Sequence, residues 1–310
     1  MKSLEQSNSK ILETQKLSIF KIWVMATRPK TLFASLGPLI LSFSLAYKLN
    51  GELQILIAAL TTLCTLLMQI ASNLINDYSD GEKGVDTEKR LGPTRVTQSG
   101  LIEAQTVKRG YQICLVLAFI LGIPLIFHGG QVIFIMGVIS LFMAYAYTAG
   151  PFPLSHYALG ELLAFFFFGP WAVSGSVYLQ TLNFEAEAFI IGLLPGFSAA
   201  ALMAINNFRD RHEDKTAGKL TLATLSNFYW AHFYPVIFIL LSSVGLSLFL
   251  SFIYENYIFL CLNFALLPFI KIFKELLKSS GGRHLNRVLG LTGAYLFLSS
   301  LTLSILLLIS

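Results

Sequence analysis

The chain has 310 residues, of which 55% are hydrophobic and only 13% charged, and its mean hydropathy is +0.67. This composition excludes an ordinary water-soluble domain and a disordered chain, and it indicates a protein embedded in a lipid bilayer. The net charge of +5 is spread over loops that also contain acids, so it does not favour nucleic-acid binding. The three cysteines stand singly in apolar segments, without a metal or disulfide spacing.

Apolar runs of about twenty residues predict an all-α, polytopic membrane protein with nine transmembrane helices. The first run follows a polar lead, so residues 1–22 are interpreted as a cytoplasmic or interfacial N-terminal segment and residues 23–310 as one intramembrane domain. The predicted spans are 31–48, 54–76, 108–127, 131–148, 159–180, 186–206, 231–253, 256–273 and 288–309.

The distribution of Lys and Arg predicts the orientation. With nine spans, every Lys and Arg except Lys48 falls on one side, in the N-terminal segment and the connections near 80–107, 149–158, 207–230 and 274–287. Because positively charged loops remain in the cytoplasm, the N-terminus and these loops are expected there. The C-terminus is expected outside, and the membrane is expected to be the inner (plasma) membrane.

The first span opens with Arg28, Pro29 and Lys30. Proline suits the first turn of a helix because its missing N–H would have no partner there in any case. Arg28 and Lys30 then lie at the cytoplasmic interface. They either anchor the helix to the membrane surface or face a bound anion.

The second span ends in a polar stripe at helical spacings of three and four, formed by Gln69, Asn73, Asn76, Asp77 and Asp80. Carboxylates and amides at the mouth of a membrane helix are costly, and they usually face a cavity that marks a functional site. The alternative is a solvated helix end with ordinary interfacial acids. The loop that follows carries Asp86, Arg90 and Arg95 and is long enough to be functional.

Tyr145 and Tyr147 end the fourth span, and Glu161 begins the fifth. Tyrosines near an interface ordinarily belong to the aromatic belt. Glu161 has no Lys or Arg in its own loop, but a helix N-terminus stabilises an acid, so a structural role is open for it.

A second polar stripe ends the sixth span, with Asn207, Asp210 and Asp214, and Lys219 follows in the next loop. Asp210 and Asp214 are four residues apart and share one face. Acids that converge from both stripes would repel each other unless cations neutralise them. Oxygen ligands without Cys or His favour Mg²⁺, which commonly bridges carboxylates to phosphates. A membrane cavity with such a site suits a polyprenyl pyrophosphate.

At this point the residues resemble a known family. Asn76, Asp77 and Asp80, with Asp210 and Asp214, resemble the two motifs of the UbiA-type superfamily of intramembrane aromatic prenyltransferases, over about residues 20–309. The family pattern places a further acid where this chain has Gly84, and the next acid is Asp86. The runs 86–95, 98–100, 147–153 and 206–222 resemble the naphthoate branch of the family.

The resemblance implies nine helices around a central cavity with cytoplasmic cap loops. It implies transfer of a polyprenyl group from a polyprenyl pyrophosphate to 1,4-dihydroxy-2-naphthoate, an aromatic acceptor, with loss of CO₂ and pyrophosphate. The product would be demethylmenaquinol, in menaquinone synthesis. In this chemistry an allylic cation attacks the ring carbon that bears the carboxylate.

The resemblance also implies roles for individual residues. Two Mg²⁺ ions would be held against pyrophosphate by acids of the two motifs, with a further ligand in the loop: Asp77, Asp80, Asp210, Asp214 and Asp86. Amides would orient these ligands, namely Asn73, Asn76 and Asn207. Basic residues would contact phosphate or the naphthoate carboxylate, namely Arg28, Lys30, Arg90, Arg95 and Lys219. The ring of Tyr145 or Tyr147 would stabilise the allylic cation.

Three alternatives remain open. The acceptor could be 4-hydroxybenzoate or homogentisate. A transporter that uses intramembrane acids would place them near mid-bilayer on broken helices, whereas here they cluster at one interface. A non-catalytic membrane partner is disfavoured by two complete acidic motifs.

Overall fold

The computed structural model describes residues 18–82, 91–93 and 95–310, and in this part of the chain the fold is all-α. An isolated parallel bridge joins Tyr157 to Leu220. The helices are α2 (Ile19–Thr27), α3 (Pro29–Asn50), α4 (Ile55–Glu82), α5 (Ala104–Ala146), η1 (Leu154–His156), α6 (Gly160–Phe168), α7 (Pro170–Thr181), α8 (Ala186–Arg209), α9 (Arg211–Thr216), α10 (Leu222–Leu225), α11 (Phe228–Leu240), η2 (Leu241–Gly245), α12 (Leu246–Ile253), η3 (Tyr257–Phe269), α13 (Ile270–Leu277) and α14 (Leu285–Ile309).

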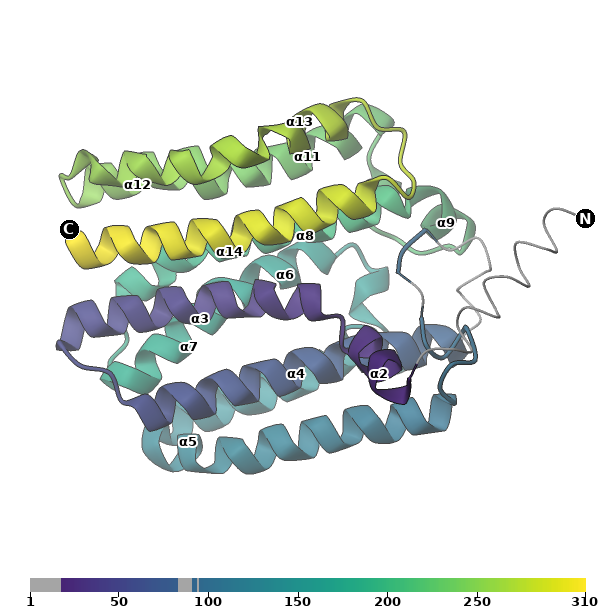
Figure 1. The fold of residues 1–310 in the computed structure, drawn as a ribbon, viewed down its shortest axis with the longest axis horizontal. Coiled ribbons are helices and arrows are strands. Elements are labelled where there is room, and N and C mark those ends of the chain that lie inside the picture. The colour runs from purple at the N-terminus through teal and green to yellow at the C-terminus, as the bar shows by residue number, and fades with distance from the viewer. Residues whose placement is uncertain (1–17, 83–90, 94) are drawn as a thin grey trace, which may run out of the picture.

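The long helices lie side by side along the longest axis of the molecule (Figure 1). Of the helices long and apolar enough to cross a membrane, α8 is the most deeply buried. Its buried side includes small residues such as Gly192, Gly196 and Ala200, which let neighbouring helices approach closely. Helix α14 packs against both α3 and α8, so the last helix of the chain lies beside its first long helix (Figure 1).

Helix α5 contains two of the predicted spans, 108–127 and 131–148, in one 43-residue segment. It is not one straight helix, because Gly130 has φ 65° and ψ −151° and interrupts the helical geometry. Such a backbone conformation is open to glycine because it lacks a Cβ atom. The sequence prediction of two separate spans therefore corresponds to two arms that meet at Gly130.

The hydrogen bonds of α5 show that the two arms run in opposite directions. Thr148, just after α5, donates from its hydroxyl to Asn76 Oδ1 near the end of α4, and the loop that leads into α5 also folds onto that end of α4. His128, beside the interruption, bonds instead to the carbonyl of Leu179 near the far end of α7 at 2.9 Å. Both ends of α5 therefore lie at one end of the bundle and its bend lies at the other.

The predicted span 159–180 is divided into α6 and α7 at Gly169. Pro170 follows, which begins α7 because proline cannot continue the preceding hydrogen-bond ladder. A Cβ atom built on Gly169 would lie 2.5 Å from Gly196 Cα and 2.6 Å from the Gly192 carbonyl oxygen. The break therefore brings backbone directly against the backbone of α8.

Replacing Gly169 by Ala is expected to destabilise the protein, because the added methyl group would force α6 and α7 away from α8. Overpacking of this kind costs about 1–3 kcal/mol. The check is the melting temperature of detergent-purified protein. Gly122→Ala is the matched control, since a Cβ there meets no atom within 4 Å. Equal melting temperatures for the two variants would contradict this account of the contact.

The outer surface of the bundle is apolar, as an integral membrane protein requires. On α5 alone, Ile113, Phe119 and Phe127 expose half or more of their side chains. Eight segments among the described residues are long and apolar enough to cross a membrane, and α5, with its two arms, is one of them. The count of nine spans remains a prediction that depends on each arm crossing the bilayer.

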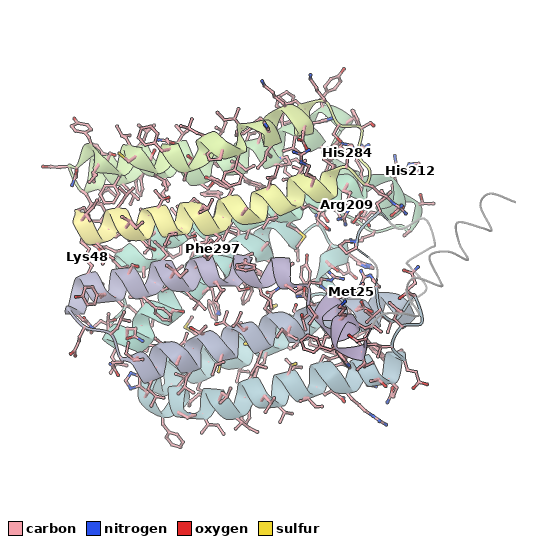
Figure 2. All side chains as sticks on the ribbon, viewed as in Figure 1. Met25, Lys48, Arg209, His212, His284 and Phe297 are labelled. Atoms are coloured by element: carbon pink, nitrogen blue, oxygen red, sulfur yellow. The ribbon has the colours of Figure 1, made fainter. Side chains whose placement is uncertain are left out.

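The two ends of the bundle differ in composition. Figure 2 shows Lys48 at one end, and Arg209, His212 and His284 at the other. The second end is also where α4 and α8 finish (Figure 1). We call it the site end, because both acidic motifs belong to these two helix termini.

Candidate functional site

The first acidic motif lies in the last turns of α4, where Asp77 is only 2% exposed. One of its carboxylate oxygens accepts from the backbone N–H of Val96 at 3.0 Å, and the other accepts from the backbone N–H of Thr97 at 2.9 Å. The Thr97 hydroxyl also donates to the Asp77 carboxylate. Asp77 therefore holds the loop that follows α4 against the end of its own helix.

The amides of the first motif connect α4 to other elements. Asn73 donates from Nδ2 to the Thr27 carbonyl at 2.9 Å and to the Thr31 hydroxyl at 2.8 Å. These two threonines flank Arg28, which joins α2 to α3 with a φ of 51°. Asn73 thus supports a junction with a left-handed residue, a conformation that is rare outside glycine.

Arg95 is buried beneath the same loop, and its guanidinium donates to the Asn76 carbonyl oxygen. Asn76 lies in the last two turns of α4, where a nearby cation interacts favourably with the helix dipole. The structure therefore places Arg95 against the end of α4, where the sequence predicted a residue that contacts substrate. The carbonyl contact is compatible with a further contact to an anion.

The second acidic motif lies at the end of α8 and in α9. Asp210 forms an ion pair with the preceding Arg209, at 2.5 Å between Nη2 and Oδ2 and 2.7 Å between Nε and Oδ1. Asp214 is 8% exposed, and both of its oxygens lie 3.4 Å from Lys219 Nζ. Burial raises the pKa of the Asp214 carboxyl to about 6, although Lys219 acts in the opposite direction. The negative charge of Asp214 is therefore costly and would gain from a cation.

A buried hydrogen-bonded cluster includes Asn207, three residues before Asp210 of the second motif. Asn207 donates from Nδ2 to Glu161 Oε1 at 2.9 Å, and the Tyr234 hydroxyl donates to the same oxygen at 3.3 Å. On the residue before Glu161, a Cβ built on Gly160 would lie 3.3 Å from the Tyr147 hydroxyl and 3.6 Å from Asn207 Nδ2. Tyr147 therefore lies beside Asn207, with its hydroxyl donating to Met203 Sδ at 3.3 Å.

Asn286 near the start of α14 connects the two motifs. Its Nδ2 donates to the carbonyl of Leu91, in the loop after the first motif, at 2.8 Å. Its Oδ1 accepts from Arg209 Nη1 at 2.8 Å, and Arg209 in turn holds Asp210. One side chain thus joins the loop of the first motif to the ion pair of the second. Neither Arg209 nor Asn286 was predicted from the sequence.

The predicted site residues that the structure describes lie at the site end, but they do not all contact one another. Asp210 and Asp214 interact electrostatically with each other, whereas the described hydrogen bonds of Asp77 go to its own loop. Tyr145 is 43% exposed. Four predicted candidates lie outside the described residues or side chains: Lys30, Asp80, Asp86 and Arg90.

The carboxylate and amide oxygens at the site end are of the type that binds a hard cation such as Mg²⁺. Within residues 18–82, 91–93 and 95–310, no three Asp, Glu, His or Cys side chains are grouped closely enough to hold a metal ion. The acids and amides at the site end nevertheless offer oxygen atoms only, which is the ligand type of Mg²⁺. Asp210 and Asp214 would hold such an ion, with the Asn207 oxygen on the same helix face.

Two pockets open at the site end. One, of about 480 Å³, lies beside the second motif, and its lining includes Arg209, Arg211, His212 and Lys215. This basic lining suits the approach of an anion.

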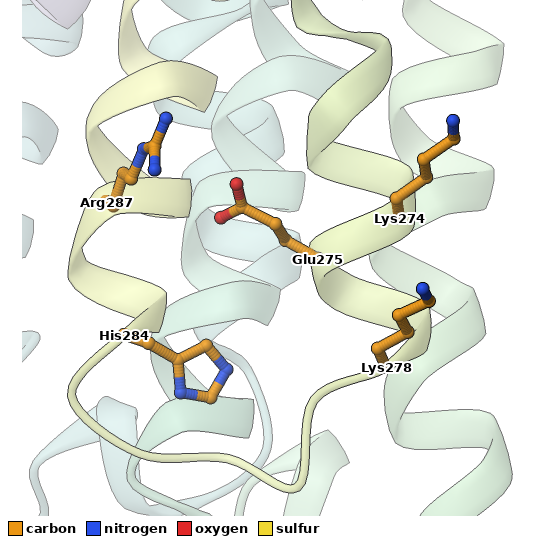
Figure 3. A pocket seen from close by; sticks show the side chains of 5 residues that line it. All are labelled: Lys274, Glu275, Lys278, His284 and Arg287. Atoms are coloured by element: carbon orange, nitrogen blue, oxygen red, sulfur yellow. The ribbon is translucent and has the colours of Figure 1, made fainter.

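The other pocket, of about 550 Å³, lies between α13 and α14. Figure 3 shows its one acid, Glu275, pointing towards Arg287 of α14, while Lys274 and Lys278 point away from it. The positive charges of this second pocket therefore do not converge.

Residues 35–308 match the model of the UbiA prenyltransferase family. The chain is 34% identical to the 1,4-dihydroxy-2-naphthoate octaprenyltransferase of Haemophilus influenzae, over 81% of this chain and 84% of that protein. It is also 34% identical to the enzyme of the same name from Escherichia coli, over 76% of this chain and 78% of that protein.

Solved structures show the same fold. A UbiA homologue from Archaeoglobus fulgidus, bound to GPP and Mg²⁺, superposes with a TM-score of 0.63 over 93% of this chain and all of that one, at 16% identity. A digeranylgeranylglyceryl phosphate synthase superposes with a TM-score of 0.60 over 94% of this chain and 99% of that one, at 20% identity. At these identities the likeness concerns the fold.

Proposed function

The chain belongs to the UbiA prenyltransferase family, and from that premise we propose that it transfers a polyprenyl group from a polyprenyl pyrophosphate to 1,4-dihydroxy-2-naphthoate. Loss of CO₂ and pyrophosphate would give demethylmenaquinol, in menaquinone synthesis. One observation carries the choice of acceptor: the 34% identity to the octaprenyltransferase of H. influenzae extends over most of both chains. The naphthoate-type runs around Arg95 and Lys219 point in the same direction.

The two acidic motifs are proposed to hold the pyrophosphate through Mg²⁺. Asp77, Asp80, Asp210 and Asp214 are the proposed ligands, with Asp86 as a further one. A bound divalent cation would stabilise the negative charge that develops on the leaving pyrophosphate. Lys219 is a proposed contact for phosphate or carboxylate, because its positive charge lies beside Asp214 at the site end. Arg28, Lys30, Arg90 and Arg95 are the other proposed contacts for phosphate or carboxylate.

The proposed reaction balances without an added base. The bond between the allylic carbon and the pyrophosphate oxygen breaks, and that carbon bonds to the ring carbon bearing the carboxylate. Loss of CO₂ then returns the electron pair to the ring, so no ring proton has to leave. Tyr147 is the better-placed of the two candidate tyrosines to stabilise the allylic cation, because its hydroxyl lies beside Asn207 in the interior.

The site end is proposed to face the cytoplasm, with the C-terminus outside and the protein in the inner (plasma) membrane. Residues 1–22 remain a proposed interfacial segment before one membrane domain. The charge distribution supports the orientation, because Lys48 is the one Lys or Arg assigned to the opposite side. An acceptor made in the cytoplasm would then reach the site directly.

A parallel assay tests the acceptor. Purified protein is supplied with one polyprenyl pyrophosphate and with either dihydroxynaphthoate or 4-hydroxybenzoate. Transfer to dihydroxynaphthoate is expected to be at least about tenfold faster, since a site that pairs with a substrate's polar groups rejects an acceptor that leaves them unpaired. Product masses identify each reaction, and homogentisate extends the comparison. Faster transfer to 4-hydroxybenzoate or homogentisate would refute the assignment.

A further inference from the structure

Glu161 is the second residue of α6 and is followed by a wholly apolar stretch, Leu162–Phe168. It is 2% exposed and lies in a segment long and apolar enough to cross the membrane. A carboxylate in such a place is costly, and such acids are usually retained for a function. A purely structural acid at a helix start, the role that the sequence left open, would not need the buried contacts that Glu161 makes.

The contacts of Glu161 are arranged unequally over its two oxygens. Asn207 and Tyr234 both donate to Oε1, whereas Oε2 is buried without a hydrogen-bond partner among the described residues. Through Asn207, Glu161 therefore contacts a residue three positions before Asp210 of the second motif.

A carboxylate can only accept hydrogen bonds, whereas an amide has one donating and one accepting end. Glu161 therefore selects the Nδ2 end of Asn207, and the Oδ1 end of that amide must face away from Glu161. Asn207 is three residues before Asp210, so the two side chains share a helix face. The Asn207 oxygen is thereby directed to the face that carries the acids.

We infer that Glu161 is a positioning residue for the second motif, which fixes the Asn207 amide so that its oxygen faces the cation held by Asp210 and Asp214. The inference rests on the proposed Mg²⁺ role of that motif. Hydrogen-bond partners that orient metal ligands commonly change metal affinity or activity by about 10–100-fold when they are removed. Tyr234 would hold Glu161 itself in place.

The test uses full-length protein in detergent with inorganic pyrophosphate, and measures Mn²⁺ binding by electron paramagnetic resonance. Glu161→Leu removes the acceptor at similar size, and the Mn²⁺ affinity is expected to fall about 10–100-fold. Glu161→Gln keeps a carbonyl that can accept from Asn207, so a smaller loss is expected. Glu187→Gln is the matched control: this acid lies at the opposite end of α8, beside Tyr254, and should leave Mn²⁺ binding unchanged.

A double-mutant cycle separates positioning from a general loss of structure. If Glu161 acts through Asn207, then Glu161→Leu combined with Asn207→Ala should bind Mn²⁺ no more weakly than Asn207→Ala alone. Melting temperatures identify any variant that has lost its fold, and Glu161→Gln then replaces Glu161→Leu in the cycle. Additive losses, or unchanged Mn²⁺ affinity in Glu161→Leu, would overturn the inference. Because the titration uses no acceptor, an absence of prenyl transfer would count against the proposed function alone.

Discussion

Excess EDTA is expected to stop prenyl transfer by the purified protein, and added Mg²⁺ is expected to restore it. In the proposed mechanism the pyrophosphate approaches Asp210 and Asp214, whose negative charges would repel it unless a cation lay between them. The residual rate in EDTA is expected to be below about 1% of the full rate, since charge stabilisation of a leaving group contributes at least that much. Product formation is followed by chromatography.

Two controls make the EDTA result specific. EDTA mixed beforehand with a molar excess of Mg²⁺ should have no effect, which excludes an action of the chelator on the detergent or the substrate. The melting temperature should show that the protein remains folded in EDTA. Full turnover in excess chelator would exclude the metal-dependent mechanism.

Asp77→Asn is expected to lower kcat by about 100- to 1,000-fold, the range seen when one stabilising group is removed from a reaction centre. The structure gives Asp77 a second task, because its carboxylate accepts from the backbone of Val96 and Thr97. Asp77→Asn removes the negative charge that would bind a cation. It also places an NH₂ group, which donates, opposite a backbone N–H that donates as well, so one contact to the loop is lost.

Thr97→Val separates the two tasks of Asp77. It removes a hydroxyl that donates to Asp77 but leaves the carboxylate intact. If Asp77 binds the cation, Thr97→Val should retain most of its kcat while Asp77→Asn does not. If Asp77 only anchors the loop, the two variants should lose similar, small amounts of activity. A kcat for Asp77→Asn within tenfold of the wild type would contradict the assignment of Asp77 as a cation ligand.

The sequence is sufficient for the fold class because helix length and hydropathy are local properties. The sequence was less informative about breaks within a helix, because a break need not change the local hydropathy. Gly169 divides a predicted span because it meets Gly196 of another helix, and that contact is not visible in the local pattern. Gly130 is similar, since a single residue with φ 65° reverses the chain between two arms that the structure joins in α5.

For the candidate site, too, the sequence predicted local relations but not contacts between residues far apart in the chain. The spacing of four residues predicted that Asp210 and Asp214 lie near each other, and the two acids do interact across the junction of α8 and α9. It could not identify the ion pair of Arg209 or the bridge of Asn286, whose partners lie far away in the chain. Glu161 did carry a signal, as an acid next to an apolar run without a basic neighbour in its loop. The interpretation as a helix-start acid missed its partner Asn207, which is 46 residues later.

The position of Asn286 has a consequence for how the protein is made. Domains and helices are synthesised from the N-terminus onwards, so α4 and α8 leave the ribosome well before α14. The tie between Leu91 and Arg209 can form only once the helix carrying Asn286 has been inserted. Until then the loop after α4 and the ion pair at the end of α8 lack their shared partner, so this contact at the site end is completed by the last helix of the chain.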